Sequence, residues 1–331
     1  MITFNSYLRK SIEQYVDLKH NLGFKFEAEL GIFKKLDSFL IERKEEGPGI
    51  SKEFAEFWYH AFNHLHPRTK YAHCILLREF CGYLANMGIK TYCPRVPQHP
   101  KSSFVPYIFS HNQIEKLIKA SDKLTNCYHH SANGIYAFPA ILRVQYSTGL
   151  RIGETLSLND DDVDLEEKTI RIRPEITKNG LERKIPIGDS LVKILRKYKM
   201  FRDSMLTGFN HPQTFFSLVT GDPIAREQVE SYFRLCLKYA GIPYLGESKG
   251  PRLHDLRHTF ACHALANMCD QGLDIYVCLP ILSTYLGHKN TDATNWYVRL
   301  TAEVFPSVIE KVNKTCIDIF PHFRSYDYEK D

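Results

Sequence analysis

The segment "PRLHDLRHTF", Pro251 to Phe260, places two histidines four residues apart with an acid and an arginine between them. On a helix, His254, Arg257 and His258 would share one face, because residues three and four apart are neighbours. Paired histidines at this spacing are close to the zinc-protease pattern HExxH, with Asp255 in place of the glutamate. The same segment can instead hold an anionic oxygen, because a guanidinium binds phosphate with two parallel hydrogen bonds.

The surrounding residues favour the anion clamp over the metal site. A permanent cation at Arg257 would oppose a dication on the same face. Cys262 and His263 follow, but neither stands at an established spacing for a third zinc ligand. The acidic run "NDDDVDLEE", residues 159–167, lacks the glycine and the closing glutamate of a calcium loop, so we interpret it as a solvated turn. We therefore expect no metal, and zinc hydrolysis stays as the least favoured alternative.

A second arginine with a nearby acid occurs in "YSTGLRIGETLSL". Arg151 is expected just inside a helix, after an opening at residues 147–149 that is suited to capping. Glu154 follows three residues later, where its carboxylate could fix the guanidinium for bidentate binding of phosphate. An ordinary ion pair on the surface explains the same spacing, and this segment alone does not exclude it.

Two further segments carry polar residues at defined positions. Lys178 lies in "ITKNGLERKIPI", where Asn179-Gly180 predicts the turn of a hairpin between two alternating strands. In "LSTYLGHKNTDATNWYVRL" a helix should end at Gly287, with His288 in the exit and Tyr297 in the next helix. By itself Tyr297 would be interpreted as core, and His288 as an ordinary polar residue.

The order and spacing of these segments resemble the tyrosine recombinase (phage integrase) family. The resemblance covers residues 106–320 by motif and, more loosely, the N-terminal helices as a core-binding domain. Six positions correspond to the active site of that family: Arg151, Lys178, His254, Arg257, His288 and Tyr297.

The resemblance implies a site-specific DNA recombinase that acts through a 3′-phosphotyrosyl intermediate. Tyr297 would attack a DNA phosphodiester, and Arg151 and Arg257 would stabilise the charge on its oxygens. A free 5′-hydroxyl would leave, protonated by Lys178. Integration, excision, resolution and transposition of a mobile element use the same chemistry.

The remaining polar residues would support this centre. His254 and His288 would add hydrogen-bond donors to the phosphate, and Glu154 would position an arginine from behind it. No metal and no cofactor are implied. A catalytically inactive DNA-binding relative is the main alternative, and a type IB topoisomerase would share the chemistry.

The predicted fold is mainly α-helical with a small β-hairpin or sheet, in two domains that form a DNA clamp. Amphipathic periodicity predicts four helices within residues 6–23, 27–47, 51–65 and 67–88, which would form a core-binding domain over residues 1–93. Four prolines make residues 94–106 an interdomain linker. Residues 107–331 would form the catalytic domain with a C-terminal oligomerisation segment.

Composition limits the class of protein without identifying it. The 331 residues are 44% hydrophobic with a formal charge of +5, which permits a polyanionic partner but does not require one. Nine cysteines without paired short spacing are typical of reduced thiols. No apolar run of membrane length and no leader sequence are found, so we expect a cytoplasmic, nucleoid-associated protein that does not contact a membrane.

Candidate DNA contacts in the first domain lie in "HLHPRTKYAHCILLREF". A solvated helix face would have the same composition. The basic residues proposed to face a DNA groove are Arg68, Lys70 and Arg78, accompanied by His64, His66 and His73.

The resemblance also implies assembly on double-stranded DNA. Strand exchange between two duplexes requires a tetramer in the synaptic complex, formed from a free monomer or dimer at short inverted sites. The chain begins with the core-binding helices, so we expect no separate arm-binding domain. An apolar stripe in the C-terminal segment would dock into a neighbour or pack on its own domain; it comprises Val304, Val308, Ile309, Val312, Ile317 and Phe320.

Overall fold

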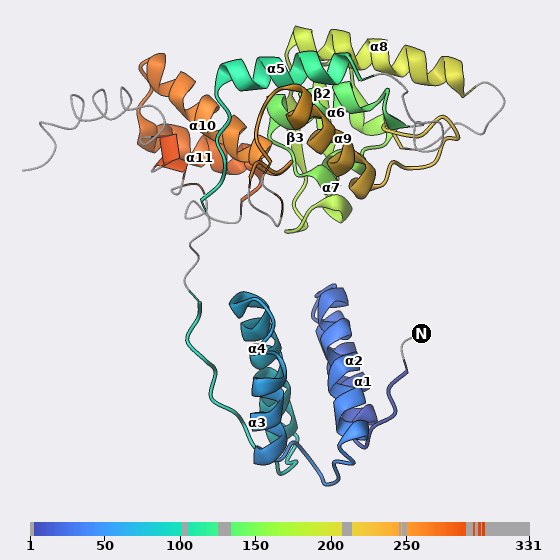
Figure 1. Ribbon diagram of the computed structural model, residues 1–331, viewed down its shortest axis with the longest axis vertical. Helices are drawn as coiled ribbons and strands as arrows, with labels where there is room; N and C mark the ends of the chain where they lie inside the picture. Colours follow the sequence, from blue (N-terminus) through green and yellow to red (C-terminus); the bar gives the residue numbers. More distant parts are fainter. Residues whose placement is uncertain are drawn as a thin grey trace, which may run out of the picture. The chain divides into compact units, whose positions relative to one another are not determined.

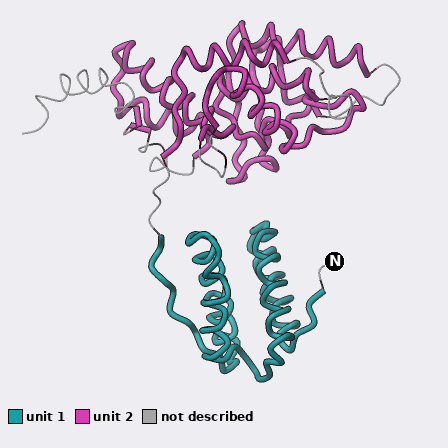
Figure 2. The backbone as a smooth tube through the Cα atoms, in the orientation of Figure 1, with its two compact units in different colours: residues 1–104 teal, residues 105–331 magenta. Residues whose placement is uncertain are grey.

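The computed structural model divides the chain into two compact units, Met1–Phe104 and Val105–Asp331 (Figure 2). The division falls inside the proline-rich segment 94–106. Each unit is described by itself. The structure describes residues 3–100, 105–124, 134–206, 214–244, 246, 250–288, 294, 297, 298, 300 and 301.

The apolar periodicity predicted the helices of unit 1, and four are found among its described residues. Its helices are α1 (Arg9–Asn21), α2 (Glu27–Glu42), α3 (Lys52–Ala61) and α4 (Pro67–Asn86). Ser51 caps α3 by accepting a 3.0 Å hydrogen bond from the amide of Phe54, and Pro67 opens α4, where its missing N–H costs nothing. Aromatic rings of α1, α2 and α4 pack edge to face at Tyr15, Phe33 and Phe80, and Trp58 of α3 packs edge to face against Phe39 and Phe62.

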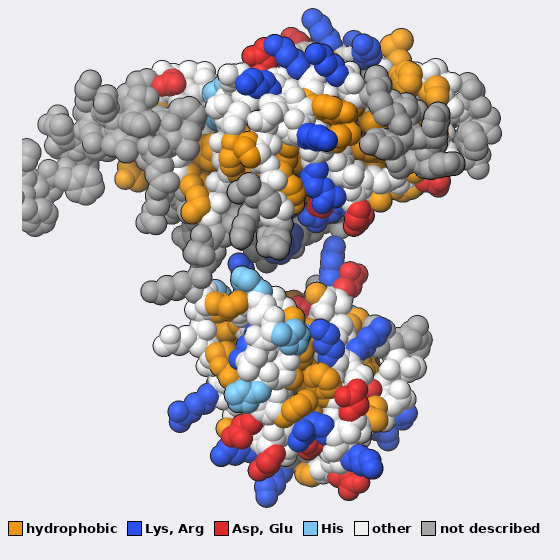
Figure 3. Space-filling model, in the orientation of Figure 1, with side chains coloured by type: hydrophobic (Ala, Val, Ile, Leu, Met, Phe, Trp, Pro, Cys, Tyr) orange, Lys and Arg blue, Asp and Glu red, His pale blue; other side chains and the backbone are white. Residues whose placement is uncertain are grey.

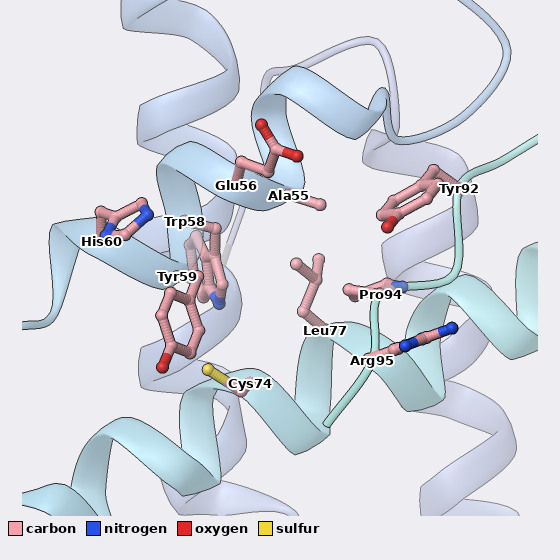
Figure 4. Close-up of a pocket in the computed structure, with 10 residues that line it drawn as sticks. All are labelled: Ala55, Glu56, Trp58, Tyr59, His60, Cys74, Leu77, Tyr92, Pro94 and Arg95. Carbon is pink, nitrogen blue, oxygen red and sulfur yellow. The ribbon is translucent and has the colours of Figure 1, made fainter. Parts of the chain in front are cut away.

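The extended segment after α4 lies against unit 1. The amide of Tyr92 donates to the carbonyl of Ile50 at 2.8 Å, and the ring of His99 packs edge-on against Tyr71. A hollow of about 220 Å³ lies between this segment, α3 and α4 (Figure 4). In the close-up, Tyr92, Pro94 and Arg95 line it opposite Trp58 and Tyr59. The proline-rich segment therefore folds back along the helices as far as His99.

Unit 2 combines helices with a small sheet (Figure 1). Helices α6 and α10 pack together at its centre, and α11 and α5 pack against them. Its described elements are α5 (His111–Asp122), α6 (Phe138–Thr148), α7 (Ile152–Leu156), η2 (Asp160–Asp162), β1 (Val163–Asp164), β2 (Thr169–Ile172), η3 (Pro174–Ile176), β3 (Arg183–Pro186), α8 (Asp189–Met205), α9 (Arg226–Tyr239), α10 (Asp255–Asp270) and α11 (Ile275–Leu286).

The predicted hairpin is confirmed, and the sheet extends beyond it. Strands β2 and β3 pair antiparallel with Ile170 opposite Ile185, and Gly180 takes the left-handed conformation in the turn between them, at φ 70°. Strand β1 adds to the free edge of β2, giving the order β1-β2-β3 among the described residues. Alternation places Ile170 and Ile185 in the core of the unit.

Residues 165–167 form a turn with Glu166 and Glu167 exposed, as predicted, but the interpretation as a solvated turn is wrong for residues 159–164. This segment forms η2 and β1, and the carboxylate of Asp162 is buried. Asp162 accepts hydrogen bonds from the amide of Asn159 at 2.8 Å and from Arg173 Nε at 2.9 Å. A run of acids looked solvated because its arginine partner stands eleven residues further along the chain.

The described cysteines are free thiols. In the part of the chain that the structure describes, no helix has the length and apolar character needed to cross a bilayer.

Candidate active site

The motif that first indicated a site begins helix α10. His254 is the residue before the helix, and Asp255 stabilises the first turn by accepting from the amide of Arg252 at 2.8 Å. His254 is exposed, whereas Arg257 and His258 are buried. The protein packed around His254, and then the charges of Arg257 and Arg252, lower its pKa to about 4. His254 is therefore a neutral ring at the surface near pH 7.

Arg257 is held by the ends of two other helices. Its Nη1 donates to the carbonyl of Gly149 at 2.7 Å, and its Nη2 donates to the carbonyl of Leu286 at 2.8 Å. Helices α6 and α11 both stop at a glycine in the left-handed conformation, Gly149 at φ 61° and Gly287 at φ 67°. The last carbonyls of a helix have no partner within it, so they are available to the guanidinium. Arg257 is therefore fixed by the backbone rather than by a carboxylate.

His288 lies at the exit of α11, as predicted, in contact with Arg257. Arg257 Nη2 donates to His288 Nε2 at 3.0 Å, and His288 Nδ1 lies 2.8 Å from Thr294 Oγ1. A guanidinium can only donate, so Nε2 must be the unprotonated nitrogen and Nδ1 carries the hydrogen. Burial and then the charges of Arg257 and Arg151 lower the pKa of His288 to about 4. In this arrangement both ring nitrogens of His288 are engaged within the protein, which was not predicted.

Tyr297 is buried and contacts helix α10 through His258. Its hydroxyl lies 2.9 Å from His258 Nδ1, and its ring is nearly parallel to that of His288, with centroids 6.2 Å apart. Burial raises the pKa of Tyr297, and Arg257 and Arg151 lower it without cancelling that effect. Burial, followed by the charges of His254 and Arg252, lowers the pKa of His258 to about 3. His258 therefore contacts the predicted nucleophile.

Arg151 and Glu154 form part of a buried ion-pair cluster. Arg151 is the residue before α7 rather than inside it, because residues 147–148 end α6 instead of opening a helix. Glu154 Oε1 accepts from Arg151 Nη1 at 2.9 Å, and Oε2 accepts from Arg183 Nη2 at 2.7 Å. The Glu154 side chain is 2% exposed, which excludes an ordinary surface pair. Burial opposes its ionisation, but Arg183 and then Arg151 keep the pKa of Glu154 below its usual value.

Lys178 occupies the turn of the β2–β3 hairpin, as predicted, and its side chain is exposed. The neighbouring Asn179 donates from Nδ2 to the carbonyl of Gly287 at 3.4 Å. The hairpin turn therefore touches the backbone immediately before His288. The structure brings the turn to the edge of the site, while the lysine side chain extends into solvent.

Sequence reasoning missed a basic hollow beside His254. A cavity of about 240 Å³ lies between α9 and the segment that leads into α10, with Arg226, Arg234, Arg252 and Tyr244 among its lining residues. Arg226 and Arg234 are eight residues apart on α9, which places them on one face of that helix. That spacing was the available signal.

The basic residues proposed in unit 1 differ in their surroundings. Arg68 and Arg78 are exposed. The Nζ atom of Lys70, in contrast, lies 3.4 Å from the centroid of the Tyr59 ring and donates to Asn63 Oδ1 at 2.8 Å. His73 is buried and stacked on Phe62, so the expectation that it faces a DNA groove is wrong. On the face shown in Figure 3, Lys and Arg side chains of unit 1 are interspersed with Asp and Glu. This face therefore carries no patch of a single sign.

The zinc interpretation gains no support from the geometry. Within the described residues, no group of three or more His, Cys, Asp or Glu side chains is arranged to hold a metal ion. The rings of His254 and His258 meet edge-on, with centroids 4.9 Å apart, and His258 Nδ1 faces Tyr297.

A mainly helical unit with a three-stranded sheet thus gathers two arginines, three histidines and a tyrosine from separate segments. Residues 108–303, more than half of the chain, match the model of the phage integrase family. The chain belongs to this family, the tyrosine recombinases, and it is a site-specific DNA recombinase.

Relatives and solved structures agree with this assignment. The chain is 27% identical to a putative integrase/recombinase y4rB of Sinorhizobium fredii, over 93% of this chain and 98% of that protein. It is 30% identical to the tyrosine recombinase XerC of Thermodesulfovibrio yellowstonii, over 71% of this chain and 72% of that protein.

Its fold is similar to that of lambda integrase. The structure of a lambda integrase dimer bound to a COC′ core site gives a TM-score of 0.58 at 18% identity, and covers 88% of this chain and 76% of that chain. The structure of a lambda integrase tetramer bound to a Holliday junction gives a TM-score of 0.57 at 16% identity, and covers 89% of this chain and 78% of that chain.

Proposed function

We propose that Tyr297 is the nucleophile of this recombinase and that it forms a 3′-phosphotyrosyl link to DNA. The observation that carries the proposal is the convergence of Arg257, His288 and Tyr297 from three segments within direct contact of one another. Arg151 lies close enough to lower the pKa of Arg257. A phosphate bound here would meet two permanent cations beside a tyrosine hydroxyl.

The arginines would supply the electrostatic part of catalysis. In the transition state negative charge grows on the non-bridging oxygens, and guanidinium groups fixed in advance stabilise it without reorganising. Arg257 is fixed by Gly149 and Leu286, and Arg151 by Glu154. Losing one preorganised donor of this kind typically costs about 3–4 kcal/mol, or 10² to 10³ in rate.

The proton balance assigns roles to His258 and Lys178. As the Tyr297 oxygen bonds to phosphorus, its proton would pass to His258 Nδ1, 2.9 Å away in the tautomer with that nitrogen unprotonated. The incoming phosphate adds negative charge, which favours the resulting imidazolium. As the bond from phosphorus to O5′ breaks, Lys178 would give its proton to O5′, leaving a 5′-hydroxyl. The reverse transfers allow a second DNA end to rejoin the strand without ATP.

Neutral histidines would complete the phosphate site. A neutral ring carries one N–H donor, and His254 stands exposed at the mouth of the site. His288 accepts a hydrogen bond from the guanidinium of Arg257, so it would act by holding Arg257 in position. We therefore assign His254 a direct contact with the phosphate and His288 a positioning role, in place of two equivalent donors.

The nucleophile is tested by covalent capture. Nicked duplexes from the DNA flanking the gene are incubated with the protein, and the fragments retained through denaturation are sequenced to define the site. Tyr297→Phe should bind that site with unchanged affinity and retain none covalently. Tyr276→Phe is the matched control, because this tyrosine is exposed on α11. Adduct formed by Tyr297→Phe would refute the assignment, and loss of adduct in Tyr276→Phe would move it to α11.

We propose further that both units bind DNA through phosphate contacts at short inverted sites, on the nucleoid in the cytoplasm of a bacterial cell. In unit 2 the basic hollow adjoins His254, which supports DNA running past the catalytic centre. In unit 1 Arg68 and Arg78 remain candidates, and Lys70 is weaker because it is engaged within the protein. Each lost phosphate contact should reduce the slope of log affinity against log salt by about 1. An unchanged slope in Arg226→Ala or Arg68→Ala would remove that residue from the interface.

For assembly we propose a synaptic tetramer that forms from monomers or dimers, by analogy with the lambda integrase tetramer on a Holliday junction. The C-terminal apolar stripe, Val304 to Phe320, lies outside the described residues. We propose that it docks into a neighbouring copy. Truncation after Leu300 should leave a protein that binds one half-site but does not pair cooperatively. Tetramers and wild-type recombination in the truncated chain would show that the stripe packs on its own domain.

A further inference from the structure

Arg183 joins three segments of the catalytic centre and has no assigned role. It is the first residue of β3, and its side chain is 9% exposed. Its Nη2 donates to Glu154 Oε2 at 2.7 Å, and its Nε donates to the carbonyl of Tyr285 at 3.1 Å. Arg183 therefore connects the hairpin to α7, which follows Arg151, and to the end of α11, which precedes His288.

Arg183 stands at the base of the loop that carries Lys178. The pairing of Ile172 with Arg183 is the last in the β2–β3 ladder before the loop. On the opposite side of the base, Arg173 donates to Asp162 at 2.9 Å. The tip of the loop touches Gly287 only through the long hydrogen bond of Asn179. The base contacts are thus shorter and charge-assisted, and such hydrogen bonds are the stronger kind.

The end of α11 is shaped to receive Arg183. Arg183 Nη1 is buried without a hydrogen-bond partner among the described residues. It packs against Gly287, where an added Cβ would lie 2.8 Å from Nη1. Tyr285, Leu286 and Gly287 thus offer successive carbonyls to Arg183, Arg257 and Asn179. The same helix end holds both the phosphate-binding arginine and the lysine hairpin.

We propose that Arg183 is a positioning residue that places the Lys178 hairpin relative to the arginines of the site. Lys178 is exposed, so the described contacts that fix its backbone decide where its ammonium can reach. One carboxylate oxygen of Glu154 accepts from Arg151 and the other accepts from Arg183. Glu154 therefore links an arginine that would bind the phosphate to the residue that would position the Lys178 hairpin. The inference rests on the proposed role of Lys178 as the acid that protonates O5′.

A change of leaving group separates positioning of the lysine from every other effect. In a normal phosphodiester the bond from phosphorus to O5′ breaks with transfer of a proton to O5′. When sulfur replaces O5′, the bond from phosphorus to sulfur breaks and leaves a thiolate, whose conjugate acid has a pKa near 8.5 and needs no proton. A variant that has lost only the positioned acid should therefore recover on the sulfur substrate.

The experiment measures covalent capture of the mapped site by Arg183→Lys, with oxygen or sulfur at the 5′ bridging position. Lysine keeps the charge but not the guanidinium fork that reaches Glu154 and Tyr285 together. On the oxygen substrate the rate should fall about 10²-fold, within the range for loss of a general acid. On the sulfur substrate it should return to within about threefold of the wild-type rate. Arg171→Lys is the matched control, because its pair with Glu182 is exposed on the same hairpin, and its rates should not change.

The comparison of two substrates on one preparation cancels any loss of folded protein. An equal deficit of Arg183→Lys on both substrates would overturn the proposal and show that Arg183 supports the fold or the arginines alone. Lys178→Ala, measured in parallel, tests the function beneath it. If sulfur does not rescue Lys178→Ala, the proposed acid is wrong. If sulfur rescues Lys178→Ala but not Arg183→Lys, the acid stands and the positioning role fails.

Discussion

Replacing Glu154 with glutamine tests whether the catalytic arginines are organised by a buried charge. The substitution preserves the shape of the side chain and removes one negative charge between two guanidiniums. The Glu154 side chain is 2% exposed, its partner Arg183 is 9% exposed, and Arg151 is 28% exposed. The pair with Arg183 therefore carries most of the effect, since solvent screens the pair with Arg151.

The magnitude follows from this geometry. Removing one partner of a buried ion pair costs about 3–5 kcal/mol, because the other charge stays buried without compensation. The glutamine amide oxygen still accepts one hydrogen bond from Arg183, so we expect about 3 kcal/mol for Glu154→Gln, the lower end of that range. In a unit the size of Val105–Asp331 each kcal/mol lowers Tm by about 2–4 °C. The expected loss is therefore about 6–12 °C for the transition of unit 2.

Low pH should abolish the difference in Tm between Glu154→Gln and the wild type. Arg183 and Arg151 lower the folded-state pKa of Glu154 below 4.5, so its stabilisation is complete above the unfolded value. It is lost as pH falls through the folded pKa, because both proteins then carry a neutral side chain. The assay is thermal unfolding of both proteins at pH 7 and at several values below 4.5. Glu182→Gln, which removes an exposed partner of Arg171, should leave Tm close to that of the wild type, because solvent screens this pair.

Two results would refute this reasoning. The first is a Tm for Glu154→Gln within about 2 °C of the wild type at pH 7, since a buried pair predicts a larger loss. The second is a difference in Tm that persists unchanged at low pH, which would mean that packing rather than charge is lost.

Three further predictions concern the chemistry. Arg257→Lys should lower the rate of covalent capture about 10²- to 10³-fold, with DNA affinity in a gel shift changed much less, because a lysine cannot reach Gly149 and Leu286 together; equal losses of rate and affinity would contradict it. His258→Ala should slow capture about 10²-fold or more, and His258→Asn should be slowed similarly, because an amide Oδ1 can accept the hydrogen bond of Tyr297 but cannot take up its proton; activity of His258→Asn close to that of the wild type would show that His258 orients Tyr297 and does not act as its base. Capture should be unchanged in excess EDTA, because fixed guanidiniums supply the positive charge, and loss of activity that zinc restores would revive the metal interpretation.

Local patterns in the sequence predicted most of the fold. The apolar periodicity of residues 51–65 corresponds to α3, and the alternation around Asn179-Gly180 corresponds to β2 and β3. These signals are short in range, because a helix or a hairpin is specified by residues a few positions apart. His73 was misplaced for a related reason. A histidine can stack in an aromatic core as readily as it can face water, and the pattern around it does not distinguish the two.

The contacts that organise the site were beyond such patterns. Arg257 meets Gly149 across 108 positions of the chain, His258 meets Tyr297 across 39, and Arg183 meets Glu154 across 29. The types of residue indicated which side chains act on a phosphate. Their supports are backbone carbonyls and a shared carboxylate, and only tertiary structure brings these groups together.

The backbone carbonyls that hold Arg257 and Arg183 limit how this site could be moved to another protein. Both arginines use carbonyls that α6 and α11 leave open where they stop at Gly149 and Gly287. If either helix were extended by one turn, its own ladder would consume those carbonyls. A designer who grafts the reactive side chains onto another scaffold would therefore also have to copy two helix endings. Replacing Gly149 or Gly287 with alanine tests this requirement. The left-handed backbone at the helix end would be strained, while every reactive side chain would stay in the sequence.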